Sequence, residues 1–361
     1  MDVLAAANGR IAMGQDVVSL AVGQPSAPAP VAVRERAARA IRTGPLGYTD
    51  ALGRTELRAA IARHYGDHYD VDVDPARIVV TTGSSAGFAL AFLSLFEPGD
   101  RVAIERPGYP AYRNIMRVLG LDVLEMPVLD GACVRTLADD GLRGLLLASP
   151  ANPTGTIASP ERLGEVAEAC DERGVRFISD EIYHRLTYDC LPDRTALSWS
   201  DRAIVINSFS KYYCMTGWRI GWMVVPPSLA RTVERVAQSL YISAPDASQI
   251  GAVEAFGASE ELDAVRDGYA RNREIMLGAL PELGFDLAAR SDGAFYAWAD
   301  VGALTDDSMA FSHRMLDEAL VAVPPGHDFD PVEGHRTMRL SYAASEAEVS
   351  EAVGRLRRWL G

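Results

Sequence analysis

Short runs of β-branched and other apolar residues recur along the middle of the chain, separated by helical or proline-marked segments. They predict strands near residues 77–81, 101–104, 145–148, 176–179 and 203–207. Strands that are apolar along their whole length are typical of a parallel sheet buried on both faces. The alternation of such strands with helices therefore predicts an α/β fold with a three-layer, mostly parallel central sheet.

Helical patterns flank this region on both sides. They predict helices at 31–41, 54–65 and through most of 228–272, and further strands at 295–299 and 337–340. The Pro/Ala-rich segment 24–30 is expected to be extended and to cross between substructures. We predict a large domain of residues 40–245 and a smaller α/β domain built from both termini, residues 1–39 plus 246–361.

Composition and charge exclude several classes of protein. The chain has 361 residues, 48% of them hydrophobic, which supplies a sizeable core. A formal net charge of −14 without a basic stripe argues against a nucleic-acid partner. No apolar stretch reaches the roughly 18 residues of a membrane span, and the N-terminus lacks the pattern of a signal peptide. The four cysteines lack paired spacing, so we expect reduced, buried thiols and a soluble cytoplasmic protein without a membrane partner.

One basic residue differs in kind from all the others. Lys211 is the only lysine among 35 basic side chains, and it follows an apolar strand in the stretch NSFSKYYCMTGWRIGW. A lysine after a strand is ordinarily a solvated loop residue. However, only an amine condenses with an aldehyde, and burial and neighbouring cations lower the pKa of an amine but not that of arginine. Lys211 is therefore a candidate for Schiff-base chemistry.

A second candidate site is the turn Thr82-Gly83-Ser84-Ser85-Ala86, which follows a predicted strand and opens an apolar helix. The free N–H groups and the dipole of such a helix form an anion site. Taken alone, the turn is an ordinary Gly-Ser turn with a capping serine. Together with Ser208, Ser210 and Arg219 beside the lysine, it favours a bound phosphate.

The lysine stretch resembles that of the class I/II aminotransferases, which have the type I pyridoxal-phosphate fold. Their motif S-x-S-K-x-x-x-M-x-G-x-R-x-G is filled in order by Ser208, Ser210, Lys211, Met215, Gly217, Arg219 and Gly221. The resemblance implies that Lys211 holds pyridoxal 5'-phosphate as a Schiff base. It also implies that the cofactor is contacted by Gly83, Ser84, Ser85, Ser208, Ser210 and Arg219 at its phosphate and by Tyr109 at its ring.

Three further residues match the family at the cofactor ring. An acid at a strand end usually caps a helix, but pyridoxal phosphate needs a carboxylate to keep its ring nitrogen protonated, and Asp180 in Ser-Asp-Glu-Ile-Tyr suits that role. By resemblance, Tyr183 and Asn152 bind the ring hydroxyl oxygen. Asn152 lies in Ser-Pro-Ala-Asn-Pro-Thr-Gly, where the resemblance suggests cis bonds before Pro150, Pro153 or both.

The resemblance also identifies the substrate side of the site. Arg339, the one charge in the strand-like run TMRLSY, corresponds to the arginine that binds the substrate carboxylate. Gly23 and Asn152 are expected close to the substrate. Tyr48 resembles the tyrosine that reaches the phosphate of the neighbouring subunit, so the resemblance implies a homodimer.

The expected reaction is transamination between an amino acid and a 2-oxo acid, with Lys211 as the base. A lyase, cyclase, racemase or oxidase of the same fold shares every residue named above and stays the alternative. A regulator that uses the fold as a binding module is disfavoured, because such proteins carry an added DNA-binding domain. The substrate is left open, since Ser26-Ala27-Pro28 departs from the family pattern. His64 and His68 have metal-ligand spacing but no third ligand, so no metal is expected.

Overall fold

The central feature of the computed structural model is a seven-stranded sheet in the order β2-β8-β7-β6-β5-β3-β4. Residues 2–127, 141–189 and 191–361 are described. The strands are β2 (Ile78–Thr81), β3 (Arg101–Arg106), β4 (Asp122–Pro127), β5 (Leu142–Ala148), β6 (Arg176–Asp180), β7 (Ile204–Ser208) and β8 (Gly221–Val224). Neighbouring strands are parallel except at β8, which is antiparallel to both β2 and β7. The predicted mostly parallel α/β sheet is confirmed.

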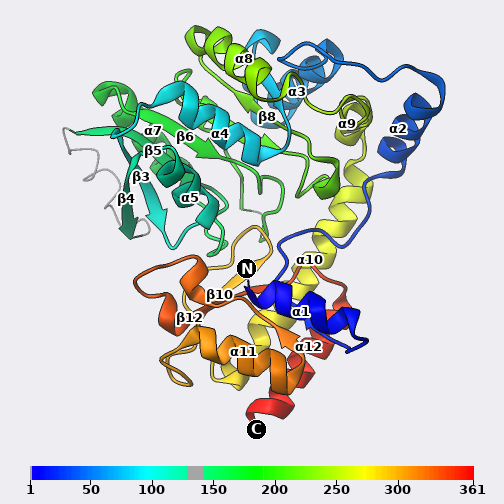
Figure 1. Ribbon diagram of the computed structural model, residues 1–361, viewed down its shortest axis with the longest axis vertical. Helices are drawn as coiled ribbons and strands as arrows, with labels where there is room; N and C mark the ends of the chain where they lie inside the picture. Colours follow the sequence, from blue (N-terminus) through cyan, green and yellow to red (C-terminus); the bar gives the residue numbers. More distant parts are fainter. Residues whose placement is uncertain (1, 128–140, 190) are drawn as a thin grey trace.

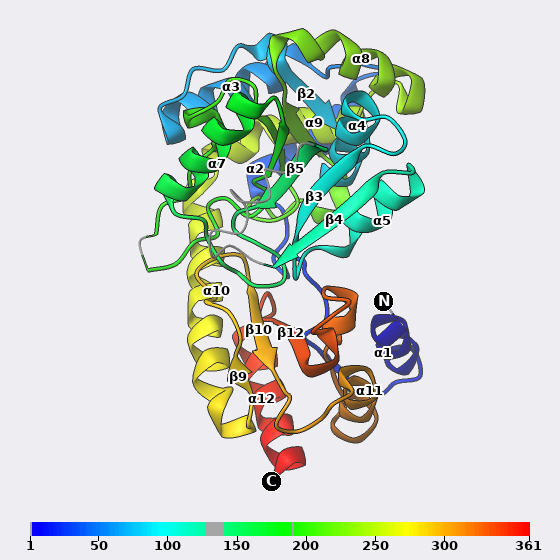
Figure 2. The same ribbon diagram turned by 90° about the vertical axis from the view of Figure 1, so that its left-hand side faces the viewer.

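Helices cover both faces of this sheet (Figure 2). One face packs against α4 (Ser84–Leu95), α5 (Pro110–Val118) and α8 (Pro227–Tyr241), and the other against α3 (Thr55–Tyr69) and α7 (Pro160–Arg173). Successive strand residues alternate between the two cores: Leu146 belongs to the first and Leu147 to the second. Because both faces are buried, the middle of each strand is a run of apolar residues, which is the pattern that made the strands recognisable in the sequence.

A second, smaller part of the molecule lies below the central sheet in Figure 1. Its strands are β10 (Tyr296–Asp300), β12 (Thr337–Ser341) and β9 (Asp286–Leu287), which form an antiparallel sheet, and β1 (Val18–Ser19), which pairs with β11 (Val321–Ala322). The helices around it are α1 (Asp2–Ala12), α11 (Ser308–Ala319) and α12 (Glu346–Leu360). The long helix α10 (Ser259–Ala279) runs from the upper part into the lower one.

The predicted helices are present with small differences at their ends. They are α2 (Val31–Thr43), α3, α8, α9 (Asp246–Ala252) and α10. The segment 24–30 contains no helix or strand and leads from β1 up to α2, which packs against α9 (Figure 1). Short 3-10 helices complete the fold: η1 (Pro75–Arg77), η2 (Ala196–Ser198), η3 (Thr216–Trp218), η4 (Val253–Gly257), η5 (Pro281–Leu283), η6 (Gly326–Asp328) and η7 (Gly334–Arg336).

Some predictions made from the sequence are not settled by the fold. The domain division at residues 40 and 245 stays a prediction. Among the four cysteines, Cys170 and Cys214 are buried, while Cys133 and Cys190 lie outside the described residues. Within the described part of the chain, every helix is too short or too polar to cross a lipid bilayer.

Candidate active site

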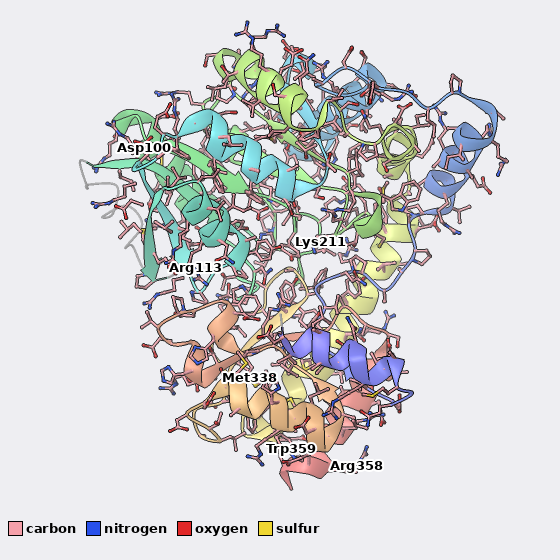
Figure 3. All side chains as sticks on the ribbon, viewed as in Figure 1. Asp100, Arg113, Lys211, Met338, Arg358 and Trp359 are labelled. Carbon is pink, nitrogen blue, oxygen red and sulfur yellow. The ribbon has the colours of Figure 1, made fainter. Side chains whose placement is uncertain are left out.

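A cavity of about 310 Å³ lies where the two parts of the molecule meet. Many of its residues lie at or after the carboxyl ends of β2, β3, β5, β6 and β7, which is where α/β sheets form their binding sites, and the others come from the smaller part of the molecule. Figure 3 shows Lys211 at this junction. The cavity brings together most of the predicted site residues: Gly23, Ser84, Ser85, Tyr109, Asn152, Asp180, Tyr183, Ser210, Lys211, Arg219 and Arg339.

Lys211 lies in the turn after β7, and its amine points into the cavity. Nζ donates a hydrogen bond to the Gly23 carbonyl at 2.6 Å. Burial lowers the pKa of Lys211 to about 8; the positive charges of Arg339 and Arg219 add to this effect, and the carboxylate of Asp180 opposes it. Because the pKa lies near neutrality, a useful fraction of the amine is uncharged and nucleophilic at physiological pH.

Asp180 ends β6 and is 2% exposed. The Tyr112 hydroxyl donates to its Oδ2, and the Ile182 N–H donates to its Oδ1 at 3.0 Å. Burial raises the pKa of Asp180 to about 6, against the opposing effect of these two donors and of Lys211. A buried carboxylate in this state gains stability from any cation placed beside it.

The part of the cavity formed by the start of α4 and by Arg219 is suited to an anion. Ser84 and Ser85 begin α4, whose first N–H groups have no partner within the helix. Gly83 precedes them with φ 76°, and a Cβ there would lie 2.5 Å from a terminal nitrogen of Arg219. Only glycine fits this backbone and this close approach. Among the described residues, no carboxylate forms an ion pair with Arg219, so its charge is available to a ligand.

The loop after β5 and the strand β12 supply the third group of polar residues. Arg339 Nη1 donates to Asn152 Oδ1 at 3.0 Å, and Nη2 donates to the Ala21 carbonyl at 2.8 Å. The guanidinium carbon lies 4.3 Å from the ring centre of Tyr296 and 4.5 Å from that of Phe329. The peptide bonds before Pro150 and Pro153 are both cis, as the resemblance suggested, and so is the bond before Pro107.

Arg339 is 7% exposed, and its Nε has no hydrogen-bond partner within the described chain. Arg339 also forms no ion pair with any of the described residues. A buried cation without a counter-ion is costly unless a ligand supplies one. The arginine is therefore arranged to receive a carboxylate from outside the chain.

Sequence reasoning missed two tyrosines of the cavity. Tyr112 contacts Asp180 directly and is buried on α5, three residues after Tyr109 and hence on the same face of the helix. Tyr296 places its hydroxyl 2.8 Å from that of Tyr183, and a Cβ at Gly23 would collide with it. The helical spacing from Tyr109 was a usable signal for Tyr112, whereas the direction in which Tyr296 points depends on the packing of β10.

Three predicted residues do not line the cavity. Gly83 lies immediately before the serines that do, and Ser208 is buried behind them with its Oγ 2.9 Å from Ser210 Oγ. Tyr48 is 84% exposed on the segment between α2 and α3. A single chain therefore does not bring Tyr48 into the site.

The residues of the cavity fit pyridoxal phosphate on structural grounds. Gly83 and Arg219, which has no ion pair among the described residues, suit its phosphate, and the buried Asp180 suits its ring nitrogen. Lys211 would supply the amine for its aldehyde. The fold and the site together define an α/β enzyme whose cavity is suited to an aldehyde cofactor with a phosphate group.

Comparison with known proteins identifies the family. Residues 15–356 match the family model "Aminotransferase class I and II", and the chain belongs to this family. It is 47% identical to the valine–pyruvate aminotransferase of Mycobacterium tuberculosis over 100% of the chain and 95% of the relative. It is 33% identical to the aspartate/prephenate aminotransferase of Thermus thermophilus over 96% of the chain and 92% of the relative.

The fold comparison agrees. The crystal structure of an aminotransferase from Mycobacterium tuberculosis superposes with a TM-score of 0.96 at 47% identity, covering 100% of this chain and 95% of that one. The predicted resemblance to the class I/II aminotransferases is thus confirmed. The roles of the individual site residues stay predictions.

Proposed function

We propose that this chain is a pyridoxal-phosphate-dependent aminotransferase that holds its cofactor through Lys211. The observation that carries the proposal is the position of this sole lysine, with its lowered pKa, between Asp180, Arg219 and Arg339. Pyridoxal phosphate supplies an aldehyde that condenses with amines and a pyridinium ring that withdraws electrons.

The chain's own residues perform four tasks in this proposal. The phosphate is held by Ser84, Ser85, Ser210 and Arg219. Tyr109 flanks the cofactor ring, and the ring hydroxyl is held by Asn152 and Tyr183. Asp180 keeps a proton on the ring nitrogen, because a carboxylate buried beside it favours the cation. Arg339 binds the carboxylate of the amino acid or the 2-oxo acid with its fork of donors. Lys211 Nζ, as a neutral amine, accepts the proton from the substrate α-carbon.

The cavity also limits the side chain of the substrate. Its described cations are Lys211, Arg219 and Arg339, each with a role already proposed. In the adjoining cavity of about 400 Å³, Arg113 is neutralised by Glu125 at 2.9 Å, and both side chains are largely buried. Leu4 of α1 and Ala21 line both cavities together with Arg339. We propose an amino donor with a neutral side chain, as in the valine named for the Mycobacterium tuberculosis relative, and not a dicarboxylate.

A screen of amino donors against 2-oxo acids tests both parts of this proposal. We expect valine-like donors to exceed aspartate and glutamate in kcat/KM by about 10²-fold or more, because a second carboxylate would be buried without a partner. Product masses should show one 2-oxo acid and one pyridoxamine phosphate per half-reaction. A preference for dicarboxylates would contradict the proposed substrate class. Keto acid without stoichiometric pyridoxamine phosphate would indicate the lyase or oxidase alternative.

We propose that two copies form a homodimer in which Tyr48 reaches the partner's site. Support comes from the exposed apolar side chains Val31 and Ile41 on α2 and Leu46 on the segment that carries Tyr48. Mixing Tyr48→Ala with Lys211→Ala should restore activity, because one site of the mixed dimer then carries both intact residues. Sedimentation should show a dimer for each variant. Failure to regain activity in mixed dimers of confirmed composition would contradict the contribution from the partner.

A further inference from the structure

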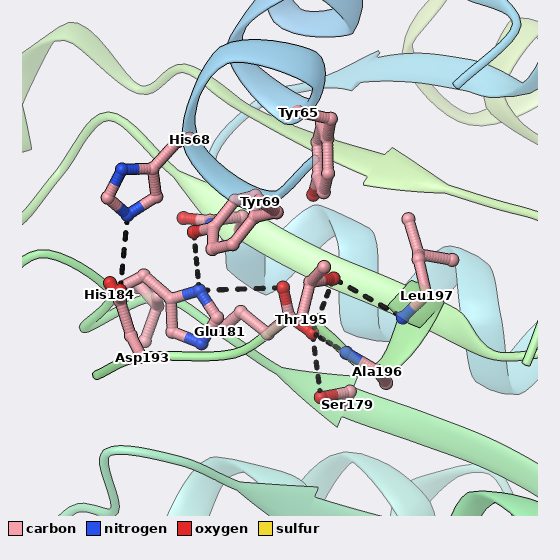
Figure 4. A network of polar contacts seen from close by, with 12 residues as sticks. Tyr65, His68, Tyr69, Ser179, Glu181, His184, Asp193, Thr195, Ala196 and Leu197 are labelled. Carbon is pink, nitrogen blue, oxygen red and sulfur yellow. Dashed lines mark hydrogen bonds and ion pairs between the residues drawn. The ribbon is translucent and has the colours of Figure 1, made fainter. Parts of the chain in front are cut away.

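Figure 4 shows a buried polar network around Glu181 and His184, which lie next in the chain to two residues that line the cavity. Asp180 and Tyr183 point into the cavity, whereas Glu181 and His184, each one residue later, face away from it into this network. Asp180 and Tyr183, which are predicted to contact the cofactor ring, are thus each followed by a buried polar residue that faces away from the cavity. None of these neighbours touches the cavity, and the proposed reaction assigns them no task.

Glu181 anchors the first half of the network. It is 0% exposed, and its Oε1 accepts hydrogen bonds from Ser179 Oγ at 3.1 Å, Thr195 Oγ1 at 3.1 Å and the Ala196 N–H at 2.8 Å. Burial raises the pKa of Glu181 to about 8, against the effect of these donors, so the carboxyl group is mainly protonated at neutral pH. The residue after Asp180 is therefore fixed to the chain around residue 195 without a buried charge.

His184 anchors the second half. Its Nδ1 lies 2.6 Å from the Tyr69 hydroxyl, and its ring also forms a hydrogen bond with the backbone of Ser149. Burial lowers the pKa of His184 to about 4, so the ring is neutral at physiological pH. With one N–H on a neutral ring, both nitrogens of His184 are satisfied when Tyr69 donates to Nδ1 and Nε2–H donates to the Ser149 carbonyl. Glu181 Oε2 lies 3.6 Å from His184 Nδ1 and has no hydrogen-bond partner among the described residues.

Ser149 connects this imidazole to the loop that carries Asn152. The Ser149 N–H donates to the Asp180 carbonyl at 3.1 Å, and its Oγ accepts from the Ala158 N–H at 3.0 Å, closing the loop that contains both cis-prolines. Asn152, three residues later, accepts from Arg339. One chain of hydrogen bonds therefore runs from Tyr69 on α3, through His184, to the loop that carries Asn152.

We propose that Tyr69, Glu181 and His184 are positioning residues, which hold the segment carrying Asp180 and Tyr183 in a fixed relation to the loop carrying Asn152. This inference rests on the proposed function. An apolar core would stabilise this region at least as well, but satisfied polar networks fix one arrangement of their segments. A reaction that depends on Asp180 and Asn152 meeting one ligand needs that fixed arrangement, since a displacement of about 1 Å costs on the order of 10²-fold in rate.

The chain offers a matched pair of variants for the test. Tyr69→Phe removes the hydroxyl that contacts His184. Tyr65→Phe removes a hydroxyl one helical turn earlier on α3 that is also buried. Among the described residues, this hydroxyl accepts a hydrogen bond only from Trp222 Nε1, at 3.2 Å. We expect similar losses of melting temperature in both. Only Tyr69→Phe should lower kcat by about tenfold and weaken the affinity of the apoenzyme for pyridoxal phosphate, because only it loosens the two segments of the site.

A second pair keeps the test informative if Tyr69→Phe folds poorly. His184→Gln retains an amide donor for Ser149 and should recover part of the kcat and cofactor affinity that His184→Leu loses. Equal kinetics and equal cofactor affinity in Tyr69→Phe and Tyr65→Phe, or a folded His184→Leu that matches the wild type in both, would overturn the proposal. These outcomes are distinct from failure of the proposed function, in which the wild type itself would neither bind the cofactor nor transaminate.

Discussion

Lys211→Ala is expected to lower turnover of the best donor by about 10⁴-fold or more. The chain contains no other lysine, so no second side-chain amine can condense with the cofactor or accept the substrate proton. The purified variant should also lack the visible absorption of a cofactor joined to the protein by a C=N bond. Turnover and absorption spectra measure both effects, and thermal melting shows whether the fold is retained. A folded variant that keeps wild-type turnover would contradict the assignment.

The same lysine predicts a pH dependence of cofactor loading. Burial and two arginines lower the pKa of its amine to about 8, and the neutral form is the one that attacks an aldehyde. Raising the pH through 8 therefore populates the reactive form, and the rate at which apoenzyme takes up the aldehyde should rise and then level off. An ordinary exposed lysine would still gain reactivity up to about pH 10.

Asp180→Asn carries the second largest expected effect, a loss of kcat of about 10²- to 10³-fold. The amide retains the shape of the side chain but has no charge to keep a proton on a ring nitrogen. Glu105→Gln in β3 is a suitable control, because burial raises the pKa of Glu105 to about 8 and its carboxyl group is mainly neutral already. Comparing kcat and melting temperature between the two variants should separate the effect of losing the charge from the effect of changed packing. Equal kcat in the two would argue against the role proposed for Asp180.

Local patterns account for the part of the fold that was predicted. The strands near Asp180 and Lys211 are short runs of apolar residues, because helices bury both of their faces. The lysine motif is a single continuous stretch that runs from the last residue of β7, through a turn and η3, to the first residue of β8. The helix α1, in contrast, was not predicted. It buries only Val3 and Ala7 through contacts with distant segments such as Leu316 of α11.

The residues of the candidate site also fall into two groups: those that local sequence patterns predict and those that only tertiary packing places. Most of its predicted members lie at or after strand ends of the central sheet, and topology alone brings strand ends of a parallel sheet together. The partners of these members come from tertiary packing: Tyr112 beside Asp180, Tyr296 beside Tyr183, and His184 behind Asn152's loop. The lowered pKa of Lys211 belongs to this second group, since burial is set by the whole fold. Tyr48 lies outside the cavity of its own chain, and the role proposed for it needs a second chain, which no pattern within one chain places.

The measurement that tests the central claim most directly is borohydride reduction of the wild-type protein loaded with pyridoxal phosphate, followed by peptide mass mapping. Reduction makes the bond between amine and cofactor permanent. The account predicts a single modified peptide, containing Lys211, together with loss of the visible absorption. A protein that takes up no cofactor, or an adduct found only at the N-terminal amine, would contradict it.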